Sequence, residues 1–170
     1  MARKEHQPRP VLVIERSPIE IVLEVAAAVG VVLGILIVAQ AWSTLLNTIP
    51  LHFGISGKPD SWVNKWNLWL FPLLCLAIDV GFLLLSRYPQ AFNYPYPITE
   101  QNAPRQYQVA RLLLVWLKTE IIWLFAFVDW EVVQATSGNI TQLNMQWFLA
   151  MLLLIFGTVG FYLRQAYLAR

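Results

Sequence analysis

Charged residues interrupt the long apolar runs of this chain, and charges inside apolar helices are the groups that pair with one another or relay protons and ions. Lys118 and Glu120 stand in one such run, Asp79 in another and Glu24 in a third. A lysine beside acids favours structural ion pairing, whereas acids without a basic partner favour a relay. Since one lysine already accounts for Asp79, we predict pairing, and transport is the alternative.

Asp79 and Lys118 are expected at the same depth. Asp79 lies eight residues before the arginine that ends its run, and Lys118 lies seven residues after the arginine that starts its own. With a rise of about 1.5 Å per helical residue, antiparallel neighbours bring both side chains to one level. We therefore predict an Asp79–Lys118 ion pair, with Glu24 and Glu120 in the same polar cluster.

A second group of residues could bind a metal or titrate together. His52 and Asp60 lie in a segment rich in glycine and proline, and Asp129 and Glu131 lie at the far end of the run that carries Lys118. Zinc and calcium sites need three or more placed ligands, and no HxxxH or CxxC spacing is present. We expect His52 to be held by a carboxylate or a backbone carbonyl, with no metal and no cofactor.

The composition indicates which elements position these residues. Of 170 residues, 58% are hydrophobic and 13% are charged, against about 25% charged in soluble domains, and the net charge of +2 is too small to suggest nucleic acid. Apolar runs near 19–46, 66–86, 108–134 and 144–164 each reach the roughly 20 residues that cross a bilayer. We predict an all-α membrane protein, a four-helix transmembrane bundle over 18–164, with short tails at 1–17 and 165–170.

The distribution of basic residues predicts the orientation. Nine Lys and Arg residues lie in the tails and around the loop between the second and third runs, whereas the other side has only Lys58 and Lys65. The positive-inside bias places both termini in the cytoplasm and the 47–65 loop outside. The N-terminal tail, with two prolines and four basic residues, is expected to be flexible and held by anionic headgroups.

Two helices have features that predict how they pack. The run from 108 to 134 has charges on both helical faces, which indicates an inner helix surrounded by the others. Ala26, Gly30 and Gly34 recur every four positions on the first helix. Such a stripe of small residues lets another helix approach closely, either within the chain or in a homo-oligomer.

The loop between the first two runs carries a spaced motif. Its residues are Ile49, Pro50, His52, Phe53, Gly54, Gly57, Pro59, Asp60, Trp62 and Lys65. Together with a second segment, Phe92 to Tyr107, this motif resembles a conserved bacterial membrane domain of unknown function, found at the N-terminus of SdpI-type toxin-immunity proteins and in short stand-alone proteins. The resemblance spans about residues 44 to 115. It implies a bacterial multi-pass plasma-membrane protein and gives no reaction.

We expect this loop to be structured, compact and rich in turns, with no regular helix, because glycine, proline, Asx and serine residues dominate it. Asp60 is placed to cap the second helix, Lys65 to reach Asp129 or Glu131, and Trp62 to lie at the headgroup layer. A rigid outer loop of this kind suits recognition of a ligand or partner.

Three classes of function follow. The first is a non-enzymatic membrane protein that binds or senses a protein or peptide partner at its outer loop, in the manner of immunity or signalling proteins; no nucleophile and base are paired in the motif. The second is a small transporter or ion-coupled protein that uses the intramembrane acids. The third is a metal-dependent membrane enzyme that uses His52, Asp60 and the outer acids. The lipid bilayer is the expected surrounding in each.

Overall fold

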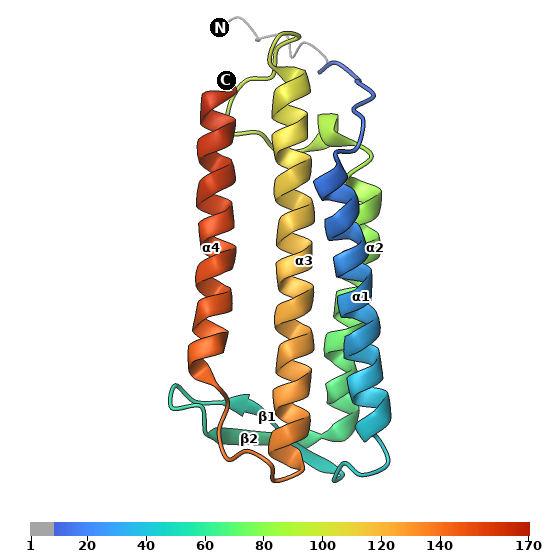
Figure 1. Ribbon diagram of the computed structural model, residues 1–170, viewed down its shortest axis with the longest axis vertical. Helices are drawn as coiled ribbons and strands as arrows, with labels where there is room; N and C mark the ends of the chain where they lie inside the picture. Colours follow the sequence, from blue (N-terminus) through green and yellow to red (C-terminus); the bar gives the residue numbers. More distant parts are fainter. Residues whose placement is uncertain (1–8) are drawn as a thin grey trace, which may run out of the picture.

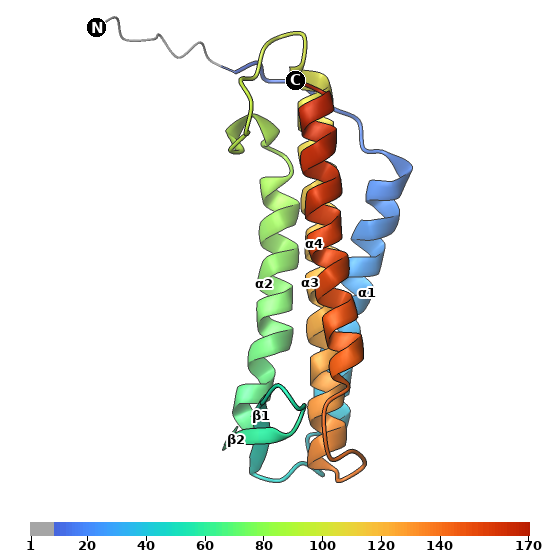
Figure 2. The same ribbon diagram turned by 90° about the vertical axis from the view of Figure 1, so that its left-hand side faces the viewer.

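The computed structural model describes residues 9–170. Four long helices lie side by side: α1 (Pro18–Ala41), α2 (Leu70–Leu85), α3 (Ala103–Thr136) and α4 (Met145–Leu168). Two short strands, β1 (Thr48–Phe53) and β2 (Pro59–Asn64), form a hairpin across one end, and the C-terminus lies at the other end (Figures 1 and 2). We call these the hairpin end and the termini end.

The start of α1 follows from its sequence. The Ser17 hydroxyl accepts a hydrogen bond from the backbone N–H of Glu20 (3.4 Å), and the Glu20 carboxylate accepts one from the backbone N–H of Ser17 (2.6 Å). Pro18 fills the first helical position, where the missing N–H costs nothing. This capping box fixes the point where α1 begins.

The segment between α1 and α2 corrects the all-α prediction. Residues 48–64 form an antiparallel hairpin, and a 3-10 turn, η1 (Lys65–Trp69), leads directly into α2. A second 3-10 turn, η2 (Pro89–Ala91), follows α2. The hairpin turn closes through Gly57, whose φ of +77° suits glycine. β-branched and aromatic residues flank the turn, and this is the pattern that favours a hairpin over an irregular loop.

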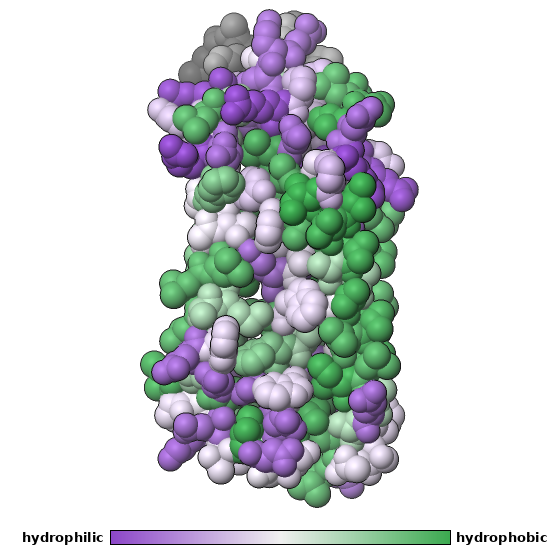
Figure 3. Space-filling model, viewed as in Figure 1, coloured by the Kyte–Doolittle hydropathy of each residue, from purple (hydrophilic) through white to green (hydrophobic). Residues whose placement is uncertain are grey.

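Helix α3 occupies the centre of the bundle and contacts α1, α2 and α4. Three helical segments are long and apolar enough to cross a membrane: Pro18–Ala41, Lys65–Leu85 and Met145–Leu168. Charged residues keep α3 out of that group, and most of those charges are buried. The outward faces of the other helices expose large apolar side chains, which cover much of the surface in Figure 3.

The small residues of α1 pack against α3, as their spacing predicts. The Ala26 carbonyl accepts a hydrogen bond from the Trp123 indole N–H (3.1 Å). A Cβ atom on Gly30 would lie 2.8 Å from the Ile122 side chain, which is closer than van der Waals contact allows. The stripe therefore serves an internal helix contact, with α1 and α3 running in the same direction.

Candidate functional site

Lys118 is the centre of a polar cluster between three helices. Its ammonium group is fully buried and donates hydrogen bonds to Asp79 of α2 (2.8 Å) and to Glu24 of α1. The predicted ion pair is therefore present. Both carboxylates are partly exposed at the bundle surface. A buried charge is tolerated when it is paired in this way, and removing one partner of such a pair is costly.

Glu120 does not join this cluster, contrary to the prediction. Its carboxylate accepts a hydrogen bond from the Thr158 hydroxyl of α4 (2.6 Å), and its second oxygen has no hydrogen-bond partner among residues 9–170. Residues two positions apart in a helix are separated by about 200° around its axis, so Lys118 and Glu120 face different neighbouring helices. The prediction considered only the depth of the two residues in the bundle and not their positions around the helix axis.

A second buried ion pair lies nearer the termini end. Arg111 of α3 contacts the Glu20 carboxylate at 2.8 Å and donates a hydrogen bond to the Ile14 carbonyl at 2.7 Å. This pair was not predicted from the sequence. The depth argument used for Lys118 could have found the pair, because Glu20 and Arg111 both stand at the start of an apolar run.

The N-terminal tail is fastened to the bundle where the structure describes it. The Tyr107 hydroxyl donates to the Pro10 carbonyl (3.0 Å), and Arg9 donates to the carbonyls of Gln90 and Phe92 (3.0 and 2.5 Å). Residues 9–17 are therefore held by protein contacts, in contrast to the flexible tail expected from composition. The part of that expectation concerning residues 1–8 lies outside the described residues.

The two outer-end acids point to opposite sides of α3. Asp129 faces α1 beside Gly34, with only 1% of its surface exposed and no hydrogen-bond partner in the described part of the chain. Glu131 faces the α3–α4 loop and accepts a hydrogen bond from the Asn144 backbone N–H (2.8 Å). The metal-enzyme alternative needs these acids beside His52 and Asp60, but no group of three metal-ligating side chains forms within residues 9–170.

His52 and Asp60 pair across the hairpin. The His52 Nδ1 lies 2.5 Å from an Asp60 carboxylate oxygen, and both side chains are largely exposed. Asp60 lies within strand β2 and its carboxylate contacts His52, so it does not cap the second helix. Asn64 caps the 3-10 turn η1 that precedes α2, because its side chain accepts a hydrogen bond from the Trp66 backbone N–H (3.0 Å), and α2 itself has no side-chain cap.

Lys65 binds the end of α1 and not the outer acids, which corrects a further prediction. Its ammonium group donates to the carbonyls of Trp42 (3.1 Å) and Leu45 (3.4 Å) and lies 4.7 Å from the centre of the Trp42 ring. The last carbonyls of a helix lack partners within the helix, so a lysine is a favourable cap there. The contact ties the base of the hairpin to α1.

The hairpin is held at its base and at its tip. Ile49 is fully buried in a core with Val38, Leu68 and Val132. At the tip, the Gly57 carbonyl accepts a hydrogen bond from the Leu143 backbone N–H (2.8 Å). A Cβ atom on Gly57 would lie 2.6 Å from the Leu143 carbonyl oxygen, so glycine is required by both its φ and its surroundings.

The remaining motif residues divide between packing and exposure. Pro50 is buried and Phe53 packs against the same core, while Gly54 and Pro59 shape the turn. Ile55 is 98% exposed and Trp62 is 57% exposed. Beside the tip lies a cavity of about 560 Å³ between the turn and the α3–α4 loop, lined by Ile55, Trp130 and Glu131 among others. The hairpin thus combines a fixed backbone with uncovered apolar and polar side chains.

Fold and sequence together describe a mostly helical protein with membrane-like helices and a small two-stranded sheet at one end. Residues 29–76 match the family model described as "Domain of unknown function (DUF1648)". This confirms the resemblance to a membrane domain of unknown function and includes the whole hairpin motif. The match does not extend to the segment from 92 to 107 that contributed to the predicted resemblance, nor to Lys118.

One relative is an uncharacterized protein from Archaeoglobus fulgidus, 32% identical over 62 residues. The alignment covers 32% of this chain and 34% of the archaeal protein, so the chain spans about a third of the length of the relative it matches. No solved structure matches this chain. These comparisons name a domain and assign no activity to it.

Proposed function

We propose that this chain is a non-enzymatic plasma-membrane protein that binds a peptide or protein partner at its outer face through the β1–β2 hairpin. Its four helices cross the bilayer, both termini lie in the cytoplasm and the hairpin lies outside. The apolar outward faces of α1, α2 and α4 support the membrane location. The excess of Lys and Arg at the termini end supports the orientation.

The pairing of its charges supports α3 as the fourth span. An unpaired charge near the centre of a membrane helix costs about 2.5 to 3.5 kcal/mol on insertion scales. Lys118 and Arg111 each contact acids from neighbouring helices, and Glu120 contacts Thr158. Because α3 contacts the other three helices and these charged residues are buried, the charges are shielded from lipid.

The binding proposal depends on one observation: the hairpin backbone is fixed to the bundle while most of β2 stays exposed. Asp60, Ser61 and Trp62 follow one another on the exposed strand, and β1 is the strand that contacts α3. An edge strand offers backbone hydrogen bonds to an added strand, and alternate side chains then give specificity. Trp62 supplies the large apolar contact that binding sites favour.

Site-specific photo-crosslinking in the native cells tests this proposal. A benzoylphenylalanine at position 62 or 55 should give the same discrete protein adduct, whereas one at Leu153, which is 72% exposed on α4, should give none. His52→Ala and Asp60→Ala should weaken the adduct at equal membrane levels. If positions 62 and 55 give no adduct beyond that of Leu153, the hairpin is not a binding element.

A second candidate is proton coupling, favoured by the carboxyl group of Asp129. It is buried without a hydrogen-bond partner in the described chain and lies on the α1–α3 interface that also carries Glu24 and Lys118. Acids in this setting bind and release protons in pumps and transporters. Proton flux into proteoliposomes, read with an internal pH dye, should disappear in Asp79→Asn and Asp129→Asn; absence of flux in the parent protein would exclude this function.

A further inference from the structure

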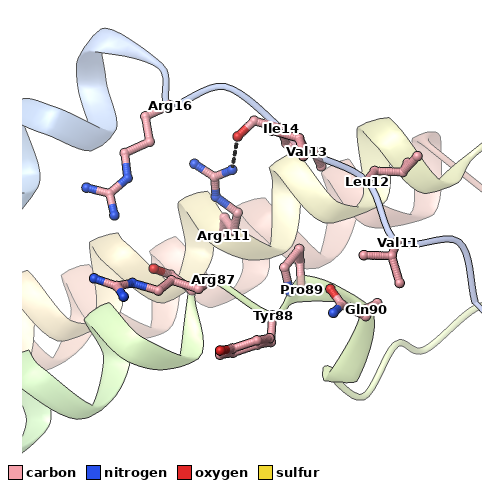
Figure 4. Close-up of a pocket in the computed structure, with 11 residues that line it drawn as sticks. Val11, Leu12, Val13, Ile14, Arg16, Arg87, Tyr88, Pro89, Gln90 and Arg111 are labelled. Atoms are coloured by element: carbon pink, nitrogen blue, oxygen red, sulfur yellow. Dashed lines mark hydrogen bonds between the residues drawn. The ribbon is translucent and has the colours of Figure 1, made fainter.

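Residues 11–16 cross the ends of α2 and α3 and cover a cavity of about 340 Å³ at the termini end (Figure 4). The hydrogen bonds from Tyr107 to Pro10 and from Arg111 to Ile14 hold this segment in place. The other wall comes from the residues after α2, from Ser86 to Gln90. The cavity is therefore built from three separate parts of the chain.

Three arginines line this cavity, and two of them lack a partner among residues 9–170. Arg111 is neutralised by Glu20 at 2.8 Å. Arg16 and Arg87 form no ion pair and no side-chain hydrogen bond with any residue from 9 to 170, and Glu15 beside Arg16 forms no ion pair there either. Figure 4 shows the guanidinium groups of Arg16 and Arg87 on the same side of Arg111. The cavity is thus lined by two arginines whose donors are not used by residues 9–170.

The surroundings of the cavity are apolar and lie at the level where the spans end. Helix α1 begins at Pro18 and α2 ends at Leu85, next to the two arginines. Val11 and Val13 on the cavity wall are 78% and 100% exposed, and Leu84 is half exposed. Exposing these apolar side chains to water is unfavourable, whereas the interface between headgroups and acyl chains would bury them.

From these observations we infer that the cavity binds the phosphate group of an anionic phospholipid of the cytoplasmic leaflet. Guanidinium groups bind phosphate oxygens in paired hydrogen bonds, which makes arginine the suited residue. A zwitterionic lipid brings its own cation and is neutral overall, so it leaves both positive charges uncompensated, whereas an anionic phospholipid neutralises one of them. The exposed valines favour a lipid over a soluble phosphate, because a lipid presents its acyl chains beside its phosphate.

Lipid binding to the purified full-length chain, counted by native mass spectrometry, tests the inference. Phosphatidylglycerol should bind the parent chain more tightly than phosphatidylcholine. The double variant Arg16→Gln/Arg87→Gln should lose about tenfold in phosphatidylglycerol affinity and keep its phosphatidylcholine affinity. Arg164→Gln, an exposed arginine near the end of α4, is the matched control and should behave as the parent. Melting temperatures establish that all variants are folded.

Two results would overturn the inference. Equal phosphatidylglycerol affinity of the parent and the double variant, or an equal loss in Arg164→Gln, would remove the assignment to this cavity. Displacement of the lipid by millimolar inorganic phosphate, with no preference for phosphatidylglycerol over inorganic phosphate, would assign the two arginines to a soluble phosphate compound and not to a lipid.

Discussion

Lys118 of α3 and Asp79 of α2 form an ion pair of 2.8 Å, and the same ammonium group binds Glu24 of α1. One side chain thus joins three helices at a single level of the bundle. Because the Lys118 side chain is fully buried, the pair fixes how the helices pack against one another. It is the clearest case in this chain of a charge placed by its neighbours.

Replacing Lys118 with methionine should destabilise the protein by about 3 to 5 kcal/mol, because Glu24 and Asp79 lose their basic partner inside the bundle. Unfolding in denaturant, followed by tryptophan fluorescence, measures the change. Lys58→Met in the exposed hairpin turn is the control and should change stability by less than about 0.5 kcal/mol. Equal stability of the two variants would show that the Lys118 cluster does not stabilise the fold.

Gly30→Ala should cost about 1 to 3 kcal/mol, since the added methyl group would lie 2.8 Å from Ile122 and force α1 and α3 apart. Gly157→Ala is the matched control, because no atom lies within 4 Å of its added Cβ. There the helix propensity of alanine should leave stability unchanged or raise it. The melting temperatures of both variants in detergent decide between contact and helix propensity.

Gly57→Ala should displace the tip of the hairpin from the α3–α4 loop. Both the positive φ and the contact with the Leu143 carbonyl oppose a side chain there. Gly138 has a similar φ of +74° but open surroundings, so Gly138→Ala measures the backbone strain alone. Limited proteolysis should cut the 54–58 turn faster in Gly57→Ala than in Gly138→Ala. Equal cleavage rates would mean that the Leu143 contact does not hold the tip.

Alkaline pH should loosen the segment that follows α2. Burial raises the pKa of the Tyr94 hydroxyl above its usual value of 10.0, and this hydroxyl donates to the Pro89 carbonyl at 2.8 Å. A group whose pKa is higher in the folded state stabilises below its unfolded pKa, and this stabilisation is lost as the pH rises through the folded pKa. Above about pH 10 the stability should therefore fall less steeply in Tyr94→Phe than in the parent. Parallel curves would contradict the assignment.

The sequence sufficed for those features that follow from regular helix geometry. The rise per residue placed Asp79 and Lys118 at one level, and the spacing of Ala26, Gly30 and Gly34 placed them on one face. The structure confirms both. The start of α1 is of the same kind, because the capping box formed by Ser17 and Glu20 needs only local residues.

Other features depend on contacts that no local pattern reveals. Lys65 had several partners within reach, and the carbonyls at the end of α1 are its partners because the hairpin folds back under that helix. Glu120 was misplaced since rotation about α3 was not applied to the cluster. The contacts of residues 9–17 with the bundle were missed because they are made by backbone carbonyls. Tyr107 and Arg111 donate to the carbonyls of Pro10 and Ile14, and composition gives no information on such acceptors.

Topology in intact cells tests the central claim most directly. With Cys75→Ser as background, single cysteines are placed at Glu15, Ser61 and Arg170, all of which are exposed, and are labelled with a membrane-impermeant maleimide. Four crossings with an outer hairpin predict labelling at position 61 in intact cells, and labelling at positions 15 and 170 only after permeabilisation. Labelling of position 15 or 170 in intact cells, or protection of position 61, would contradict it.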